Sequence, residues 1–92
     1  MTLQDLFDDL CKWTQGATAR DENGRSVAPG SSEAVSYCLQ GGALICCRTP
    51  DEFLEVMNKL RAAAGVDILW KWNDAYNRTF KEVRELIEKA NV

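Results

Sequence analysis

The chain has 92 residues, with 11 lysines and arginines, 14 aspartates and glutamates and no histidine, which gives a formal net charge of -3. A chain of this length can build one modest hydrophobic core, so we expect a single domain over residues 1–92. The acidic balance disfavours a protein held on nucleic acid by bulk charge, although it is compatible with a local basic patch. No apolar run approaches the roughly 20 residues that span a bilayer, and no signal peptide is recognisable, which indicates a cytoplasmic protein.

The first predicted element is a helix that begins after a capping Thr2. Its apolar residues recur at helical spacing, and Gln15-Gly16 is expected to end it. The residues that share the predicted buried face are Leu3, Leu6, Phe7, Leu10 and Trp13.

A β-hairpin is predicted over residues 17–28, because Asn23-Gly24 can supply the positive φ angles of a tight turn between two short strands. After the break at Pro29-Gly30, a second helix is expected over residues 33–47. Gly41-Gly42 inside this helix predicts a kink or a close approach by another helix.

The second half of the chain carries the clearest helix signals. Residues 49–52, Thr-Pro-Asp-Glu, are typical of a helix start, and Gly65 is expected to end that helix. Residues 66–72 alternate between apolar and polar side chains, which predicts a third strand paired with the hairpin. Thr79 and Glu82 predict a capping box at the start of the last helix. The fold class that follows is α+β, with about four short helices and a small antiparallel sheet.

The four cysteines do not follow a zinc or disulfide pattern. Cys11 stands alone, Cys38 falls in the second predicted helix, and Cys46 and Cys47 are adjacent. With no C-x-x-C pair and no histidine, we expect free thiols, no metal site and no cofactor. Cys11, Cys38 and one of the adjacent pair are expected in the core.

The sequence offers little for catalysis. Without histidine the usual general base and the Ser-His and Cys-His pairs are missing, and no glycine-rich phosphate loop occurs. Adjacent carboxylates such as Asp8-Asp9, Asp21-Glu22 and Asp51-Glu52 are explained by helix caps and solvated faces. We therefore expect no catalytic residue and a non-enzymatic protein, and a small carboxylate-based hydrolase is the remote alternative.

Residues 70–84 form the best candidate binding surface, because they combine aromatic rings with cations that could engage RNA or an acidic protein groove. The competing interpretation places Trp70 and Trp72 in the core and leaves the cations solvated. A second basic set lies at the hairpin and before the third helix. The candidate residues for partner or crRNA binding are Arg20, Arg25, Arg48, Lys71, Arg78 and Lys81.

Three motifs stand out along the chain. The first is Trp13-x-Gln15-Gly16-x-x-Ala19-Arg20-Asp21-x-x-Gly24-x-x-Val27; the second is Ala34-Val35-x-Tyr37-Cys38-x-x-Gly41; the third is Trp72-Asn73-Asp74 followed by Arg78-Thr79-x-x-Glu82-Val83. As a set they resemble a family of small uncharacterised proteins of bacteria and their phages. That resemblance implies no activity and no catalytic residue.

In size, acidity and single-domain build the chain is also similar to phage-encoded anti-CRISPR proteins, particularly inhibitors of type I-F surveillance complexes. This second resemblance implies a protein that binds a Cas protein–crRNA complex in the host bacterial cytoplasm and blocks recognition of target DNA. The alternative is a non-enzymatic cytosolic accessory module, bacterial or phage, with another partner. A phage gene beside a helix-turn-helix regulator would favour the inhibitor.

Overall fold

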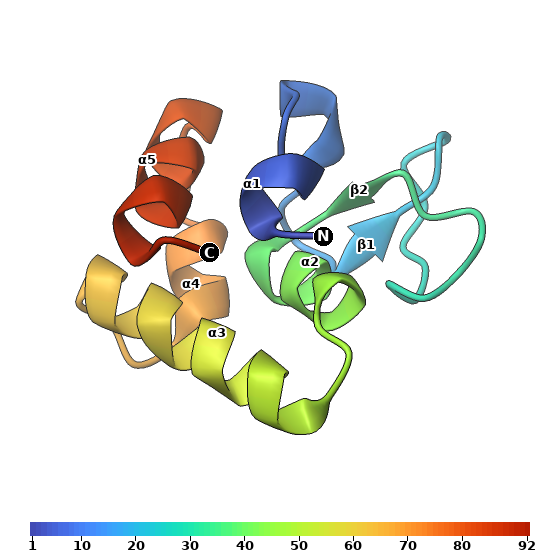
Figure 1. The fold of residues 1–92 in the computed structure, drawn as a ribbon. Coiled ribbons are helices and arrows are strands. Elements are labelled where there is room, and N and C mark those ends of the chain that lie inside the picture. Colours follow the sequence, from blue (N-terminus) through green and yellow to red (C-terminus); the bar gives the residue numbers. More distant parts are fainter.

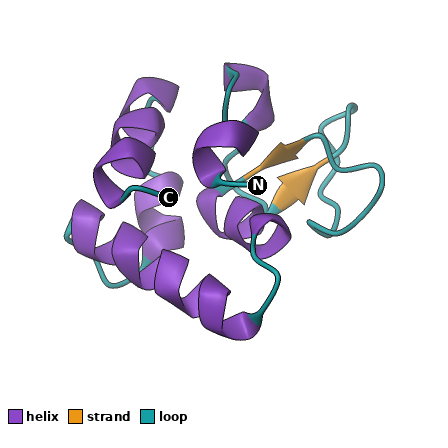
Figure 2. Ribbon diagram, viewed as in Figure 1, coloured by secondary structure: helices purple, strands orange, loops and turns teal.

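The computed structural model describes residues 1–92 and contains five α-helices, one short 3-10 helix and one two-stranded antiparallel sheet (Figures 1 and 2). The strands and their long loops lie to one side of the helices. This architecture confirms the predicted α+β class. No helix has both the length and the apolar composition to cross a membrane.

The elements follow one another with short connections, except around the strands. Helix α3 packs against α2, α4 and α5, and α1 packs against α2 and α5. In chain order the elements are α1 (Leu3–Leu6), η1 (Leu10–Lys12), β1 (Ala19–Arg20), β2 (Ser36–Tyr37), α2 (Leu39–Cys46), α3 (Pro50–Ala64), α4 (Leu69–Asn73) and α5 (Phe80–Ala90).

The core lies between the helices and draws on every one of the five. Phe7, Leu39 and Ile87 are fully buried in it, and they come from three different parts of the chain. Burial of such side chains is the main source of stability in a domain of this size. The buried cluster consists of Leu3, Leu6, Phe7, Leu39, Ala43, Met57, Leu60, Leu69, Val83, Leu86 and Ile87.

The first helix is shorter than predicted. Thr2 caps it as expected, in a capping box with Asp5, but α1 ends at Leu6 and Leu10 is 62% exposed. Arg84 of α5 explains the break, because its guanidinium donates to the carbonyl oxygens of Gln4 and Phe7 at 2.8 and 2.9 Å. These carbonyls lie at the end of the helix, where a partner from another element replaces the next helical turn.

The predicted turn at residues 23–24 forms, and the predicted hairpin forms in part: Asp21 N donates to Arg25 O at 2.9 Å and Val27 N donates to Ala19 O at 3.0 Å, but the returning residues are not a regular strand. Gly24 has a φ of 80°, whereas Asn23 has no positive φ. The carboxylate of Asp21 holds this turn, because it accepts from the backbone N–H groups of Asn23 and Arg25, both at 2.9 Å. Beyond the turn the returning chain makes one isolated bridge, between Ser26 and Arg20.

On its other edge β1 pairs with β2, which lies in a segment that the sequence predicted to be helical. Ala19 lies opposite Tyr37 and Arg20 opposite Ser36. Helix α2 therefore begins at Leu39 rather than at residue 33, and Cys38 becomes its N-cap, with the thiol accepting from Gly41 N. Strand pairing across a long loop decided this region, and local helix signals could not reveal it.

The predicted close approach of another helix is confirmed at Gly42, which meets the residue after α1, whereas Gly41 is approached by a loop. A Cβ atom on Gly41 would collide with the carbonyl oxygen of Thr18, and one on Gly42 would lie 2.7 Å from the ring of Phe7. Both glycines are buried. They let α2 sit directly against the chain before β1 and against the residue that ends α1.

Helices α3 and α5 confirm their predicted starts. Thr49 Oγ1 accepts from Glu52 N, and Gly65 ends α3 in the left-handed conformation. The Glu52 carboxylate accepts from Arg48 N instead of closing the box on Thr49. At α5 the box with Thr79 and Glu82 is reciprocal.

The predicted third strand is wrong, because residues 69–73 form helix α4 and residues 66–72 do not join the sheet. Leu69 and Asn73, four residues apart, are 2% and 1% exposed, while Ile68 and Trp70 are 45% and 53% exposed. Burial thus follows the period of a helix. The apolar alternation that predicted a strand instead leaves two large side chains at the surface.

Candidate functional site

Asn73, at the end of α4, is the centre of a buried hydrogen-bond network. Its Oδ1 accepts from Trp13 Nε1 at 2.9 Å and from Leu39 N at 3.1 Å. Its Nδ2 donates to Thr14 O at 3.1 Å and to Asp74 Oδ1 at 2.9 Å. The side-chain amide of asparagine offers two acceptor positions and two donors, so Asn73 is fully satisfied at 1% exposure.

The first and third motifs meet around this residue. Gln15 Nε2 donates to the carbonyl oxygens of Asn73 and Ala75, at 2.9 and 3.0 Å. Gly16 N donates to Asp74 Oδ1 at 3.1 Å. The residues that looked most distinctive in the sequence therefore hold α4 against the segment between η1 and β1, and their first task is structural.

Two of the six candidate cations, Arg20 and Arg78, also help to hold these segments in place. Arg20 donates to Thr14 Oγ1, Gln15 O and Gly24 O at 2.9–3.0 Å. Arg78 stacks 3.8 Å from the centroid of the Trp72 ring and donates to Trp72 O and to Glu82, each at 2.9 Å. Neither guanidinium is free in the way that the sequence interpretation assumed.

The other four candidate cations are exposed. Lys71 lies over the ring of Trp70, 5.7 Å from its centroid, and Lys81 lies 3.9 Å from Glu85 of the same helix. The side chains of Arg25 and Arg48 make no hydrogen bond.

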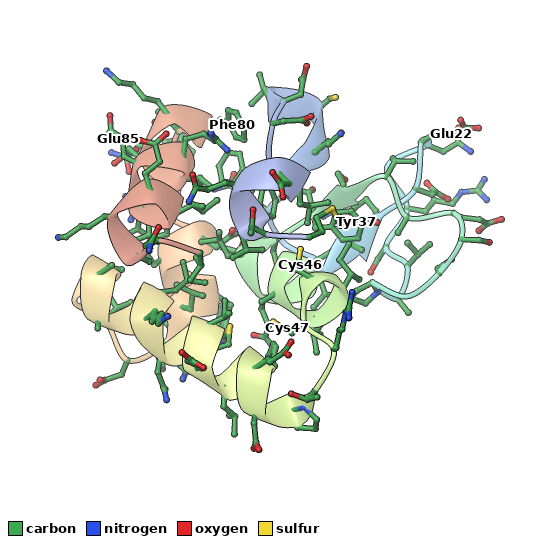
Figure 3. All side chains as sticks on the ribbon, viewed as in Figure 1. Glu22, Tyr37, Cys46, Cys47, Phe80 and Glu85 are labelled. Atoms are coloured by element: carbon green, nitrogen blue, oxygen red, sulfur yellow. The ribbon has the colours of Figure 1, made fainter.

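The surroundings of Arg25 are acidic. Asp21, Glu22 and Glu33 line a hollow of about 280 Å³ formed by the long loops beside the sheet, and Glu22 points away from the helices (Figure 3). Asp21 also accepts from Arg25 N, and these carboxylates weaken the attraction of the loop for a polyanion. The hairpin cations are therefore poorer candidates for phosphate binding than the sequence suggested.

Three large apolar side chains in and around α4 are exposed, and with Lys71 we call them the Trp70 surface: Ile68, Trp70, Lys71 and Tyr76. Tyr76 is 102% exposed and Trp70 is 53% exposed. Both side chains project from a backbone that the Asn73 network holds in place. The interpretation that places both tryptophans in the core is therefore wrong for Trp70. Trp72 is half-buried and lies under the guanidinium of Arg78.

A shallow pocket of about 220 Å³ adjoins the Trp70 surface. It is lined by residues 16–18, Cys38, Gln40, Trp70 and Asp74, which come from the chain before β1, the start of α2 and helix α4. Asp74 is its one charged residue. The sequence did not point to this pocket, because three separate segments build it.

The thiols are not activated nucleophiles. Burial raises the pKa of the Cys38 thiol, in spite of the hydrogen bonds that its sulfur accepts at the start of α2. Burial likewise raises the pKa of Cys46 to about 11. Cys46 and Cys47 lie where α2 ends (Figure 3). At neutral pH these sulfurs are protonated and react slowly.

Cys11 departs from the expectation of a core residue, because it is exposed at η1. A hydrogen bond with Asp9 raises the pKa of its thiol. The four sulfurs thus lie in three different settings, and no group of three or more histidine, cysteine, aspartate or glutamate side chains is placed to hold a metal ion.

A comparison with models of known protein families supports the resemblance to an uncharacterised family, and it does not bear on the resemblance to anti-CRISPR proteins. The model of a family described as of unknown function (DUF6197) matches residues 5–91. No curated protein and no solved structure matches the chain. The family match covers nearly the whole chain and assigns it no activity.

Proposed function

Because the chain belongs to the DUF6197 family, which has no assigned activity, we propose its function from its own surface: it is a non-enzymatic binding protein that docks through the Trp70 surface. Its specific form is a phage-encoded anti-CRISPR protein. In the bacterial host cytoplasm it binds a type I-F Cas protein–crRNA surveillance complex and blocks recognition of target DNA.

The observation that carries this proposal is the exposure of Trp70 and Tyr76 on a firmly held backbone. Tryptophan and tyrosine provide a large share of binding energy at protein interfaces. Their exposure is also unfavourable, because moving their apolar area out of water lowers the free energy. Asn73 is hydrogen-bonded at all its side-chain positions between them, so binding would order little backbone.

The non-enzymatic class is supported by the side chains themselves. The chain contains no histidine, and burial raises the pKa values of Cys38 and Cys46, which disfavours thiolate chemistry at neutral pH. The pocket beside Trp70 holds one carboxylate and no second acid or base. A general acid–base pair of the kind that hydrolases use has no candidate there.

The exposed cations extend the proposed interface. Lys71 belongs to the Trp70 surface, and Lys81 projects from the first turns of α5 with 86% of its side chain exposed. Such ammonium groups can meet crRNA phosphates or acidic loops of a Cas protein. In this proposal Arg20 and Arg78 act indirectly, by keeping residues 14–15 and 72 in position.

The net charge of -3 favours the alternative in which RNA takes no part. In that form the chain is a cytosolic accessory module, bacterial or phage, and the Trp70 surface meets a protein partner alone. The two forms share the surface and differ in the partner.

Binding to a purified type I-F surveillance complex tests the proposal. The double variant Trp70→Ala with Tyr76→Ala should weaken binding by roughly tenfold or more and relieve inhibition of target DNA binding in a gel-shift assay. Leu54→Ala is the matched control, because Leu54 is a large apolar residue of α3 with 54% exposure. It should leave both readouts unchanged.

Two results would count against the proposal in different ways. If the wild-type chain binds no surveillance complex at micromolar concentration, the proposal of an anti-CRISPR inhibitor is wrong and the proposal of an accessory module remains. If it binds and the double variant binds equally well, the Trp70 surface is not the interface.

A further inference from the structure

The pocket beside Trp70 has the chemistry of a site for a cationic planar group, and we infer that it receives the guanidinium of an arginine side chain from a protein partner. This inference rests on the proposed function only for the source of that arginine. Three observations support it: the charge of the pocket, the free oxygen of Asp74 and the ring of Trp70.

The charge of the pocket is negative. Asp74 is the only lining residue with a charged side chain. The others are glycine, alanine, threonine, cysteine, glutamine and tryptophan. Asp74 has no ion-pair partner: the structure contains five salt bridges, and none includes Asp74. A half-buried carboxylate without a cation favours a cationic ligand.

One oxygen of Asp74 is already used and the other is free. Oδ1 accepts from Gly16 N at 3.1 Å and from Asn73 Nδ2 at 2.9 Å, whereas Oδ2 makes no hydrogen bond. The first pair of bonds fixes the carboxylate, so that the second oxygen can accept without reorganising. The side chain of Gln40 makes no hydrogen bond either, and its carbonyl can accept a further guanidinium N–H.

The Trp70 ring supplies a face on which a flat cation can stack. It is 53% exposed and lines the pocket, and the ammonium of Lys71 already lies 5.7 Å from its centroid. Tryptophan attracts cations more strongly than other aromatic residues, and guanidinium groups stack on it while they donate hydrogen bonds in their own plane. A carboxylate beside a ring fits this combination of contacts.

The nearby cations do not fill the site. Arg20 Nη2 lies close to Gly16, but its guanidinium donates to Thr14, Gln15 and Gly24 and does not line the pocket. Lys71 does not line it either. An RNA phosphate is disfavoured here, because it would approach Asp74 with a charge of the same sign.

Titration with Nα-acetyl-L-arginine amide, followed through the indole N–H signals in NMR spectra, tests the inference without any partner protein. We expect saturable shifts of the Trp70 signal. The citrulline counterpart, which is neutral and has nearly the same shape, should bind at least roughly tenfold more weakly, because charge-assisted hydrogen bonds exceed neutral ones.

Asp74→Asn should weaken arginine binding by roughly tenfold or more, since it removes the charge and keeps an oxygen that can accept from Gly16 N. Asp67→Asn is the matched control, because Asp67 is an exposed carboxylate of the loop before α4. Gln40→Ala tests the amide independently through the same Trp70 signal, should Asp74→Asn perturb the fold.

Three outcomes overturn the inference: no saturable shift, equal binding of arginine and citrulline, or binding of adenosine in preference to arginine, which would make the pocket a reader of RNA bases. Failure of the surveillance complex to bind leaves this titration unaffected. Conversely, a pocket that ignores arginine leaves the test of the Trp70 surface standing.

Discussion

Trp13 and Asn73 lie 60 residues apart in the sequence and are joined by a hydrogen bond of 2.9 Å from the indole Nε1 to Oδ1. The same oxygen accepts from Leu39 N, at the start of α2. One buried amide therefore connects η1, α2 and α4. Leu39 N is buried, so water cannot readily replace the amide there, whereas Trp13 and Thr14 are half-buried.

Asn73→Ala should destabilise the protein by about 2–4 kcal/mol, because it leaves the buried donor Leu39 N without a partner and removes the partners of the half-buried Trp13 Nε1 and Thr14 O. Urea unfolding followed by circular dichroism measures the change. Asn77→Ala is the control, since Asn77 is exposed a few residues away. Equal midpoints for the two variants would contradict the role of the network.

Gly41→Ala should cost about 3 kcal/mol or more, or prevent folding, because the added methyl group would collide with the carbonyl oxygen of Thr18. Gly30→Ala adds the same group where no atom lies within 4 Å, and Gly30 has a negative φ. It should be neutral or slightly stabilising. Thermal unfolding of both variants is the measurement, and a Gly41→Ala protein as stable as the wild type would refute the close approach.

Arg20→Met should destabilise the protein, whereas Arg25→Met should leave its stability within about 0.5 kcal/mol of the wild type. Arg20 gives up three hydrogen bonds, two of them to backbone carbonyls, while the side chain of Arg25 is exposed and makes none. Chemical denaturation distinguishes them. The comparison also shows why charge reversal at Arg20 or Arg78 cannot by itself identify a binding surface.

Glu82 should make stability depend on acid pH. Its carboxylate accepts from Thr79 N, which holds its pKa below the usual value of 4.5. A lowered pKa in the folded state contributes stability above 4.5, and that contribution is lost as the pH falls through the lowered pKa. Glu82→Gln should flatten this part of the pH dependence. Urea midpoints on both sides of 4.5 test it, and an unchanged slope in the variant would count against it.

The four thiols should react in order of access. Cys11 is exposed, whereas Cys38 is buried and Cys46 has a pKa raised to about 11 by burial. Limited alkylation with iodoacetamide in the folded state should therefore modify Cys11 first, and Cys38 should react only after unfolding. Peptide mass spectrometry assigns the sites. Early modification of Cys38 would mean that the N-terminus of α2 opens readily.

The elements that were predicted correctly have signals that lie within a few residues of one another. Thr49 and Thr79 identify the starts of α3 and α5, because a cap is a local contact with the backbone N–H three residues later; only Thr79 and Glu82 form a reciprocal capping box. Gly65 marks the end of α3 for the same reason.

The elements that were missed depend on distant residues. Helix α1 ends where Arg84 binds the carbonyls of Gln4 and Phe7, and Tyr37 lies in a strand because Ala19 is opposite it. Neither contact can be read from local periodicity. Helix α4 has no capping side chain at Ile68 and was therefore mistaken for a strand.

The candidate site shows the same division. Residues 70–84 were singled out from composition alone, because aromatic residues among cations are a local signal, and within them Trp70, Lys71 and Tyr76 lie at the surface. The structural roles of Arg20 and Arg78 could not be predicted from the sequence. Most of the groups that accept their hydrogen bonds are backbone carbonyls, which every residue possesses. The pocket at Asp74 was missed because its walls come from three segments.

The long span between Trp13 and Asn73 also bears on how the chain folds. Closing a loop of this length is entropically costly and precedes any gain from the contact. Helices α3 and α5 can begin from their own caps, but the amide of Asn73 finds its partners only when the residues before β1 have reached α4. The order of assembly that follows places the segment carrying Trp70 among the last parts of the molecule to become fixed.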